Sequence, residues 1–312
     1  MSRIAVCIPT RNDNNEPGTL AFPLVTLAVQ SYRDLEVYVR DEGKRDAYAD
    51  RSLRGAVSLL AQRGIGLNYT RTADRRGAGH ARHSLFKSIK NEELVLWLDD
   101  DMILEPEAVA RLLEVLDPRA EVGFAQGTKV ELDPFRCHQN DINRLNGAGG
   151  PCEPFRIWFG DTALLLVRTE ALRQIDWDVV TRYQLDGLCG EDVSMSLMVA
   201  QRYEGWGVPE ARGWHLSPTA SRWTWEASSD ALQTELLRGK VAPDILRKAM
   251  PHMAPFISEN GEAGDPEAPV PPVAPKSVTE PTEPGAPPPP NGPTVPPAPT
   301  GSRPPGGRGS AD

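Results

Sequence analysis

The sequence predicts an α/β fold in which a doubly wound, mostly parallel sheet is flanked by helices. Two observations lead to this prediction. Short β-rich runs alternate with helical stretches over the first 116 residues, and the run at 94–98 is apolar throughout. Alternating strands and helices are typical of βαβ units, and an uninterrupted apolar run is typical of a strand buried on both faces of a parallel sheet.

The expected elements follow one another in βα order. Strands are expected at 4–8, 35–39, 65–69 and 94–98, and helices at 24–31, 52–62 and 81–89. Another helix is expected to begin near Pro106, with Glu105 and Glu107 in its first turn and an apolar face formed by residues 109, 112, 113 and 116. In such sheets ligands bind beyond the carboxyl ends of the strands, so residues that directly follow a strand are candidates for the site.

The composition changes sharply near the end of the chain, which predicts one folded domain over 1–257 and a disordered tail over 258–312. From Asp265 onward lie 17 of the 30 prolines, and no aromatic residue follows Phe256. Such a segment buries too little apolar surface to offset its ordering entropy, and we expect it to be extended. It is either a docking ligand for a proline-binding domain or a solubilising spacer.

Charge and cysteine content exclude several classes of protein. The formal charge of −9 argues against nucleic acid as a partner. The apolar runs are far too short for a transmembrane segment and no signal peptide is recognisable, so we expect a cytoplasmic protein. Four scattered cysteines predict reduced thiols, and Cys137, His138 and Cys152 lack the spacing of zinc ligands.

Three consecutive aspartates, Asp99, Asp100 and Asp101, follow the apolar run at 94–98. Adjacent carboxylates at the end of a buried strand repel one another, and desolvation penalises each charge. A divalent cation such as Mn²⁺ or Mg²⁺ relieves both effects, because these ions prefer oxygen ligands. The alternative is that one aspartate caps the helix near Pro106, although capping needs only one. The run therefore predicts a metal site.

Two further segments follow expected strands. Asp41 ends the second strand, where its carboxylate can accept hydrogen bonds from a nucleobase or a ribose, or can belong to an ordinary turn. The basic, glycine-containing loop at 75–82 leads into a helix, and its backbone amides together with Arg82 suit a diphosphate.

Acids and a histidine later in the chain are open to two interpretations each. Gly190, Glu191 and Asp192 precede a helical stretch, and the two acids either act in the chemistry or only favour the helix N-terminus through its dipole. His215 stands alone, and a lone histidine is more often structural than a metal ligand.

Taken together, these segments resemble the family 2 glycosyltransferases, which have the GT-A fold of nucleotide-diphospho-sugar transferases. The resemblance covers residues 4–216 and depends on several motifs in a fixed order. The matching segments are Ile4–Asn12, Gln30–Asp41, Trp97–Asp101, Gly190–Asp192 and Val208–Ala211 with His215.

The resemblance implies an inverting hexosyltransferase that moves a sugar from a nucleotide-sugar donor to an acceptor hydroxyl, with Mn²⁺ or Mg²⁺. It implies Asp192 as the catalytic base with Glu191 beside it, and Asp101 with His215 as metal ligands. The implied donor contacts are Pro9, Arg11 and Asp41 for the nucleobase pocket and Asp99 and Asp100 for the ribose and diphosphate, to which the loop analysis adds Arg82. A loop beside the sugar and acceptor is implied at Trp158, Phe159, Gly160 and Asp161.

The sequence departs from the family in places, and other functions stay open. Asp41-Glu-Gly-Lys44 replaces the usual Asp-Asp-Gly-Ser, and the 136–155 segment matches nothing in the family. A sugar nucleotidyltransferase would need a glycine-rich loop after the first strand, where Pro9-Thr-Arg-Asn12 stands. A non-catalytic carbohydrate- or partner-binding protein is the other alternative. The donor nucleotide and sugar are undetermined, and the acceptor is a glycan, a lipid-linked sugar, a protein or a small molecule.

Overall fold

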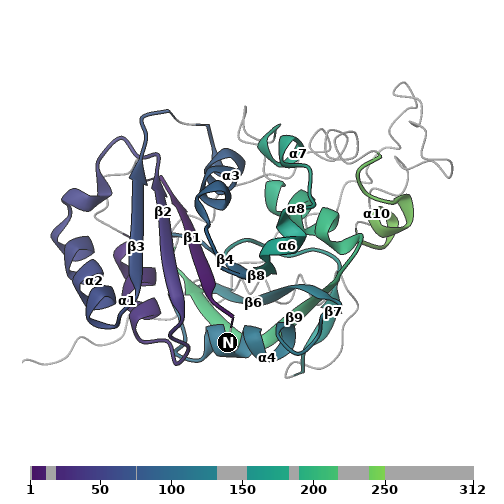
Figure 1. Cartoon of the computed structure of the whole chain (residues 1–312), viewed down its shortest axis with the longest axis horizontal. Helices are drawn as coiled ribbons and strands as arrows, with labels where there is room; N and C mark the ends of the chain where they lie inside the picture. Colours follow the sequence, from purple (N-terminus) through teal and green to yellow (C-terminus); the bar gives the residue numbers. More distant parts are fainter. Residues whose placement is uncertain are drawn as a thin grey trace, which may run out of the picture. The chain divides into compact units, whose positions relative to one another are not determined.

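Nine strands form one mixed sheet in the part of the chain that the computed structural model describes, which comprises residues 2–11, 19–74, 76–131, 153–182, 190–216 and 239–249. The strand order is β3-β2-β1-β4-β8-β6-β9-β5, and β7 also pairs with β9 (Figure 1). The strands are β1 (Ile4–Thr10), β2 (Leu35–Asp41), β3 (Gly66–Arg71), β4 (Leu94–Leu98), β5 (Met102–Leu104), β6 (Val122–Glu131), β7 (Phe155–Ile157), β8 (Leu164–Arg168) and β9 (Glu204–His215).

The predicted mostly parallel sheet is confirmed. Strands β3, β2, β1 and β4 are mutually parallel, and β6 is parallel to β9. Strand β8 runs antiparallel between β4 and β6, and β5 and β7 run antiparallel to β9. Six strands therefore place their carboxyl ends at one edge of the sheet, and β8 begins at that same edge.

Helices cover both faces of the sheet, as Figure 1 shows for α1 and α2 beside β1–β3 and for α6 and α8 beside β6–β9. On one face the core includes residues of α1, α2 and α4, and on the other it includes residues of α3, α6, α7, α8 and α10. The helices are α1 (Ala21–Ala28), η1 (Ala47–Ala49, a 3-10 turn), α2 (Arg51–Gln62), α3 (Ala78–Ser88), α4 (Ala108–Leu116), α6 (Thr169–Leu172), α7 (Trp177–Arg182), α8 (Glu191–Ala200) and α10 (Pro243–Ala249).

Strand β4 is apolar throughout because it is covered on both faces. Leu96 and Leu98 belong to one core and Val95 and Trp97 to the other, and all four are fully buried. Burial of apolar surface stabilises the folded state by about 25 cal/mol per Å², so the burial of these side chains stabilises the position of the strand. The residues that directly follow Leu98 therefore begin from a rigid support.

Local signals explain the boundaries of α2. The carboxylate of Asp50 accepts a hydrogen bond from the backbone N–H of Ser52 at 2.7 Å, which satisfies an amide at the helix start. The helix buries Leu53 and Leu60 on one face, and it ends before Gly64, whose φ of 75° suits a glycine.

Several boundaries of the predicted helices were wrong, including the start of α3, which lies at Ala78, three residues before the predicted 81. Helix α4 begins at Ala108, so Pro106 and Glu105 precede it and Glu107 occupies the capping position without a side-chain cap bond. Strand β5 separates Asp101 from that helix, so the alternative in which Asp101 only caps α4 is wrong as well. The first helix starts at Ala21, three residues earlier than the predicted 24, and Pro23 is accommodated in its first turn.

The predicted tail at 258–312, almost all of the 136–155 insert, and Cys137, His138, Cys152 and Cys189 lie outside the described residues. Cys7 is a buried free thiol in β1. Among the helices described, none has the length and apolar character needed to cross a membrane.

Candidate active site

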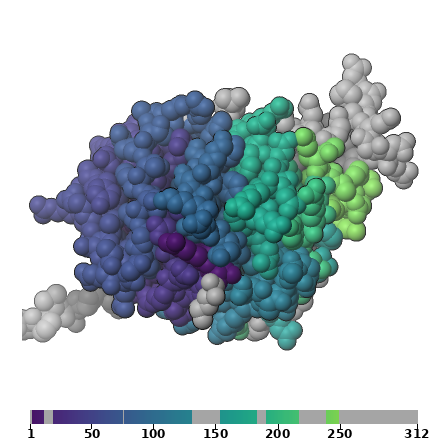
Figure 2. Space-filling view, in the orientation of Figure 1, coloured from purple at the N-terminus to yellow at the C-terminus, as the bar shows by residue number. Residues whose placement is uncertain are grey.

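The candidate site lies at the carboxyl edge of the sheet, where β4 and β9 end and where α3 and α8 meet. Residues far apart in sequence converge there from β4, α3, α8, β9 and the segment before β8. Figure 2 shows the blue part of the chain that contains α3 lying directly against the teal-green part that contains α8. Helices α3 and α8 are therefore in contact at this edge.

Asp99, Asp101 and His215 form a cluster whose ligand atoms lie within 4.8 Å of one another. The Nε2 atom of His215 is 3.1 Å from a carboxylate oxygen of Asp101. The backbone brings them together, because Met102 pairs with His215 between β5 and β9 and the N–H of Leu216 donates to the carbonyl of Asp101 at 2.8 Å. This cluster contains both predicted metal ligands and adds Asp99, which the sequence had placed on the donor.

Asp100 is held against the end of β1. The hydroxyl of Thr10 donates to its carboxylate, and the backbone N–H of Arg11 also bonds to it. Burial raises the pKa of Asp100 to about 7, and the Thr10 bond opposes that increase. Pro9 lies beside Thr10 in β1, and Arg11 follows it as an exposed residue. The three predicted donor contacts Pro9, Arg11 and Asp100 are thus neighbours.

Arg82 connects the two halves of the site. Its Nη1 donates to Glu191 at 2.8 Å and its Nη2 to Asp99 at 3.3 Å, and the residue is only 4% exposed. Among the described residues its buried Nε has no hydrogen-bond partner. Arg82 lies inside α3 and not in the predicted loop, and it bridges two acids; its contact with a diphosphate stays a prediction.

Asp192 lies in the first turn of α8, beside Glu191. Its carboxylate accepts the backbone N–H of Val193 at 2.8 Å. Burial raises the pKa of Asp192 to about 8, and the negative charges of Glu191 and Asp161 add to the increase. A carboxylate whose pKa lies near neutral pH is suited to accept a proton during a reaction.

The predicted loop at 158–161 is fixed against the same helix. The N–H of Gly160 donates to the hydroxyl of Ser196 at 3.0 Å, and that hydroxyl donates to the carbonyl of Asp192 at 2.8 Å. A Cβ at position 160 would lie 2.7 Å from both the Gln126 Oε1 and the Leu165 Cδ1 atoms, so a larger residue there would require these side chains or the loop to shift. The loop and the predicted base are therefore held in register by Ser196.

Trp158 forms the outer end of this loop. The Arg156 guanidinium lies 5.9 Å and the Lys248 ammonium 5.4 Å from the centre of its ring. Both distances fit cation–π contacts. Helix α10 therefore touches the loop through Lys248, a contact that the sequence did not suggest.

Sequence reasoning missed Lys129, which is near the end of β6. Its ammonium lies 2.6 Å from a carboxylate oxygen of Asp161, and its side chain is only 12% exposed. The segment at 117–131 carries no motif that we could assign, and β6 contains other polar residues, so no local signal distinguishes Lys129.

Asp41 is placed differently from the other predicted donor contacts. It is fully buried at the end of β2, and its oxygens accept the N–H groups of Gly43 at 2.7 Å and Ala47 at 3.0 Å and the hydroxyl of Tyr69 at 2.5 Å. The Nε of Arg71 lies 3.8 Å away. These bonds fit the turn interpretation of Asp41, and its contact with a nucleobase stays a prediction.

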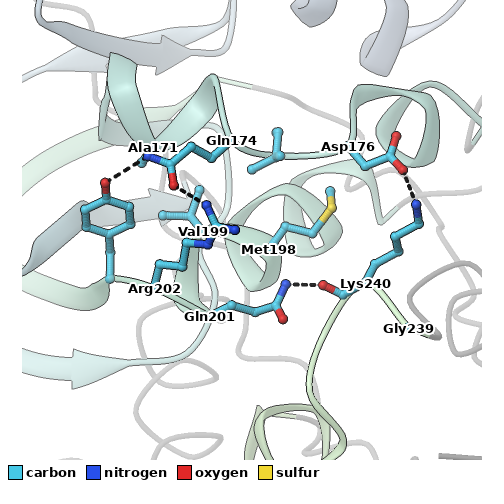
Figure 3. Close-up of a pocket in the computed structure, with 11 residues that line it drawn as sticks. Ala171, Gln174, Asp176, Met198, Val199, Gln201, Arg202, Gly239 and Lys240 are labelled. Carbon is cyan, nitrogen blue, oxygen red and sulfur yellow. Dashed lines mark hydrogen bonds and ion pairs between the residues drawn. The ribbon is translucent and has the colours of Figure 1, made fainter.

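A hollow of about 290 Å³ lies at the opposite end of α8 from Asp192 (Figure 3). An ion pair of 2.5 Å between Lys240 and Asp176 lines it, together with Gln174, whose amide is bonded to Arg202 and Tyr203. The predicted site residues do not line this hollow. Lys240, in the segment that leads into α10, bonds to Gln201 at the end of α8 and to Asp176, which precedes α7.

The site combines a cluster fit for a cation, a buried guanidinium and an acid with a raised pKa on a doubly wound α/β sheet. Such a site can hold an anionic group beside the cation and accept a proton from a bound hydroxyl. This combination fits a transferase that binds an anionic donor.

The comparison with known families agrees. The model of the family described as glycosyl transferase family 2 matches residues 5–176, more than half of the chain, and the chain belongs to this family. Its fold is GT-A. No curated protein matches the chain.

Two solved structures illustrate the shared fold. A mannosyltransferase from Pyrobaculum calidifontis, in complex with GDP-Man and Mn²⁺, has a TM-score of 0.53 at 19% identity, covering 81% of this chain and 69% of its own. GalNAc-T7, with UDP, GalNAc and Mn²⁺, has a TM-score of 0.52 at 14% identity, covering 76% of this chain. The match spans 48%, about half, of the GalNAc-T7 chain.

Proposed function

We propose that the protein transfers a hexose from a nucleotide-diphosphate sugar to an acceptor hydroxyl, with inversion at the anomeric carbon and with a divalent cation. The observation that carries the proposal is the arrangement around Arg82. This one buried guanidinium joins Asp99 of the cation cluster to Glu191, the neighbour of Asp192. The donor side and the acceptor side of a transfer reaction would thus be linked through a single residue.

The residues present fit a divalent cation. Two carboxylates and an imidazole converge within 4.8 Å, and burial raises the pKa of Asp99 to about 6, with the charges of Asp161 and Asp101 adding to the increase. Carboxylates crowded in this way gain from a nearby cation, and Mn²⁺ and Mg²⁺ both accept such oxygen ligands. Asp99, Asp101 and His215 would hold the ion, which when bound would neutralise charge on the diphosphate leaving group. Both solved relatives contain Mn²⁺, which supports this assignment.

Asp192 is proposed as the base. Its carboxylate would take the proton of the acceptor hydroxyl while that oxygen forms a bond to the anomeric carbon and the bond from that carbon to the diphosphate oxygen breaks. A single displacement from the opposite face inverts the anomeric configuration. The carbonyl of Asp192 is bonded to Ser196, and its carboxylate to the adjacent N–H, so the base is oriented before the acceptor binds.

Asp100 is proposed to face the donor from the end of β1. Its bonds to the Thr10 hydroxyl and to the Arg11 N–H fix its orientation beside the exposed Arg11 side chain. An exposed guanidinium at that position suits a phosphate or a base edge. Pro9 and Arg11 would then line the nucleotide side of the site, with the sugar closer to Asp161.

The test uses water as the acceptor, because many transferases hydrolyse their donor slowly. The protein is incubated with Mn²⁺ and a panel of UDP, GDP and dTDP sugars, and NMR follows both the nucleoside diphosphate and the anomer of the released sugar. We expect one donor to be hydrolysed, with the inverted anomer appearing first, and we expect a chelator to stop the reaction. Release of the retained anomer would contradict the assignment of Asp192, and inertness towards every donor together with no binding would contradict the function.

A further inference from the structure

The ion pair between Lys129 and Asp161 is a feature of the site that the proposed chemistry does not use. Lys129 belongs to β6 and Asp161 to the segment that enters β8, and these two strands pair with each other. The pair distance is 2.6 Å, and the Lys129 side chain is nearly buried. Ion pairs that are exposed on the protein surface contribute little to stability. This pair is short and nearly buried, and it joins two segments that are far apart in sequence, so we expect a role beyond stability.

The carboxylate of Asp161 is held from two sides. Oδ1 accepts the backbone N–H of Ala163 at 2.8 Å, and Oδ2 lies against the Lys129 ammonium. The orientation of the carboxylate is therefore set by the protein itself. The Asp161 side chain nevertheless remains 31% exposed, so a ligand can reach it. Each carboxylate oxygen has two lone-pair positions and can accept a further hydrogen bond from a sugar hydroxyl.

Hydrogen bonds connect the Asp161 segment to both the donor side and the acceptor side of the site. The backbone N–H of Ala163 donates to Asp161, and the carbonyl of Ala163 accepts the N–H of Asp99 in the cation cluster at 3.3 Å. Gly160, the residue before Asp161, donates its N–H to the hydroxyl of Ser196, which donates to the carbonyl of Asp192, the proposed base. Asp161 is therefore placed to contact a sugar held between these two acids.

We propose that Lys129 is a positioning residue for Asp161, and that the pair forms the subsite that binds hydroxyl groups of the transferred hexose and so contributes to the choice of donor sugar. This inference rests on the proposed function. Neighbouring hydroxyls of a sugar ring present two hydrogen-bond donors close together. A carboxylate held in a fixed orientation accepts both hydrogen bonds only when the hydroxyls have the matching arrangement. Lys129 holds that orientation, because its ammonium fixes Oδ2 of Asp161 while the N–H of Ala163 fixes Oδ1.

The experiment separates binding of the sugar from binding of the nucleotide. Calorimetry with Mn²⁺ measures the affinity for UDP, GDP and dTDP and for sugar nucleotides that include UDP-glucose, UDP-galactose and GDP-mannose. The variants are Lys129→Met, Lys129→Arg and the near-isosteric Asp161→Asn. Lys240→Met serves as the matched control, because it removes a lysine–aspartate pair of similar length outside the site (Figure 3).

We expect Lys129→Met to bind the nucleoside diphosphate within about twofold of the wild type but the sugar nucleotide at least about tenfold more weakly. Lys129→Arg should recover most of this loss, and Asp161→Asn should show the same selective loss even where Lys129→Met folds poorly. Lys240→Met should match the wild type. A purely structural ion pair would weaken both ligands together or neither.

Equal effects on the nucleotide and the sugar nucleotide would overturn the role of Lys129, as would unchanged affinities in both Lys129→Met and Asp161→Asn. Loss of turnover in Asp161→Asn with unchanged sugar-nucleotide affinity would also overturn it, because Asp161 would then act in the chemistry. Failure of the wild-type protein to bind any of these nucleotides would instead refute the proposed function, which makes the two failures distinguishable.

Discussion

Replacing Arg82 with methionine tests the most buried charged contact in the site. The substitution keeps an extended apolar side chain but leaves Asp99 and Glu191 without their shared cation. The bond to Glu191 is 2.8 Å and the longer one to Asp99 is 3.3 Å, and the Glu191 and Asp99 side chains are 14% and 29% exposed. Removing one partner of a buried ion pair costs about 3 to 5 kcal/mol, and the partial exposure of Asp99 places our expectation near the lower end, at about 3 kcal/mol.

The loss should depend on pH in a defined direction. Burial raises the pKa of Asp99 to about 6 in the folded protein, above its ordinary value near 3.8. A carboxyl whose pKa is raised by folding stabilises the folded state at low pH, and this contribution is lost as the pH rises through the folded pKa. Since Arg82 holds the pKa of Asp99 down, its removal raises that pKa further. The stability difference between the variant and the wild type should therefore be larger at pH 8 than near pH 4.5.

Urea denaturation at both pH values measures this difference. Thermal unfolding gives an independent measure: at about 2 to 4 °C per kcal/mol for a domain of this size, the expected decrease in Tm is about 6 to 12 °C at pH 8. Arg111→Met is the matched control, because Arg111 also contacts two acids, Glu114 and Glu210, but on the surface of α4, where ion pairs contribute little. A loss below about 1 kcal/mol for Arg82→Met, or an equal loss at both pH values, would refute the reasoning.

Three further predictions concern turnover. Asp192→Asn should lower kcat at least about a hundredfold with donor affinity nearly unchanged, because a general base contributes about 10² to 10⁴ in rate; near-normal turnover would remove Asp192 from the mechanism. Because burial raises the pKa of Asp192 to about 8, the base becomes competent only as the pH rises, and kcat/KM should increase with pH through that region; a profile that is flat from pH 6 to 9 would argue against it. Gly160→Ala should lower kcat more than it lowers nucleotide affinity, because its Cβ would lie 2.7 Å from Gln126 and would shift the loop that Ser196 connects to Asp192. A fully active variant would contradict this role of the loop.

The first half of the fold was predictable because its local signals agree with its tertiary environment. The strands at β1, β2, β3 and β4 were each identified within two residues at their starts, since short β-rich or apolar runs alternate with helical stretches. The start of α4 was misplaced because Pro106 satisfies the rule for a first helical residue but belongs to the preceding turn. Strands β6 and β8 need antiparallel partners that are distant in sequence, and no local pattern specifies them.

The site was predictable only in part, and the reason is sequence separation. Asp99–Asp101 could be recognised locally, because three adjacent acids after a buried strand are difficult to explain without a cation. The bond between Arg82 and Glu191 joins residues 109 positions apart, and its existence depends on how α3 packs against α8. Lys129 was missed for the same reason, since its partner Asp161 is brought near by the pairing of β6 and β8.

The cation cluster shows what the resemblance to a family adds to local reasoning. His215 alone did not indicate a metal ligand, but the order of motifs in the resemblance assigned it to the metal. In the structure its Nε2 atom lies 3.1 Å from a carboxylate oxygen of Asp101. Asp99 was assigned to the donor by the same resemblance, whereas its carboxylate lies within the cluster as well. The same carboxylate also forms the ion pair with Arg82.

The central claim is that Asp99, Asp101 and His215 hold a cation through which a nucleotide-sugar donor is bound. Calorimetry of the nucleoside diphosphate that binds best, with Mn²⁺ and with a chelator, tests it most directly in the wild type and in Asp101→Ala. The account predicts that Mn²⁺ strengthens binding at least about tenfold in the wild type and has no effect in Asp101→Ala. Equal affinity with and without Mn²⁺ in the wild type would contradict it.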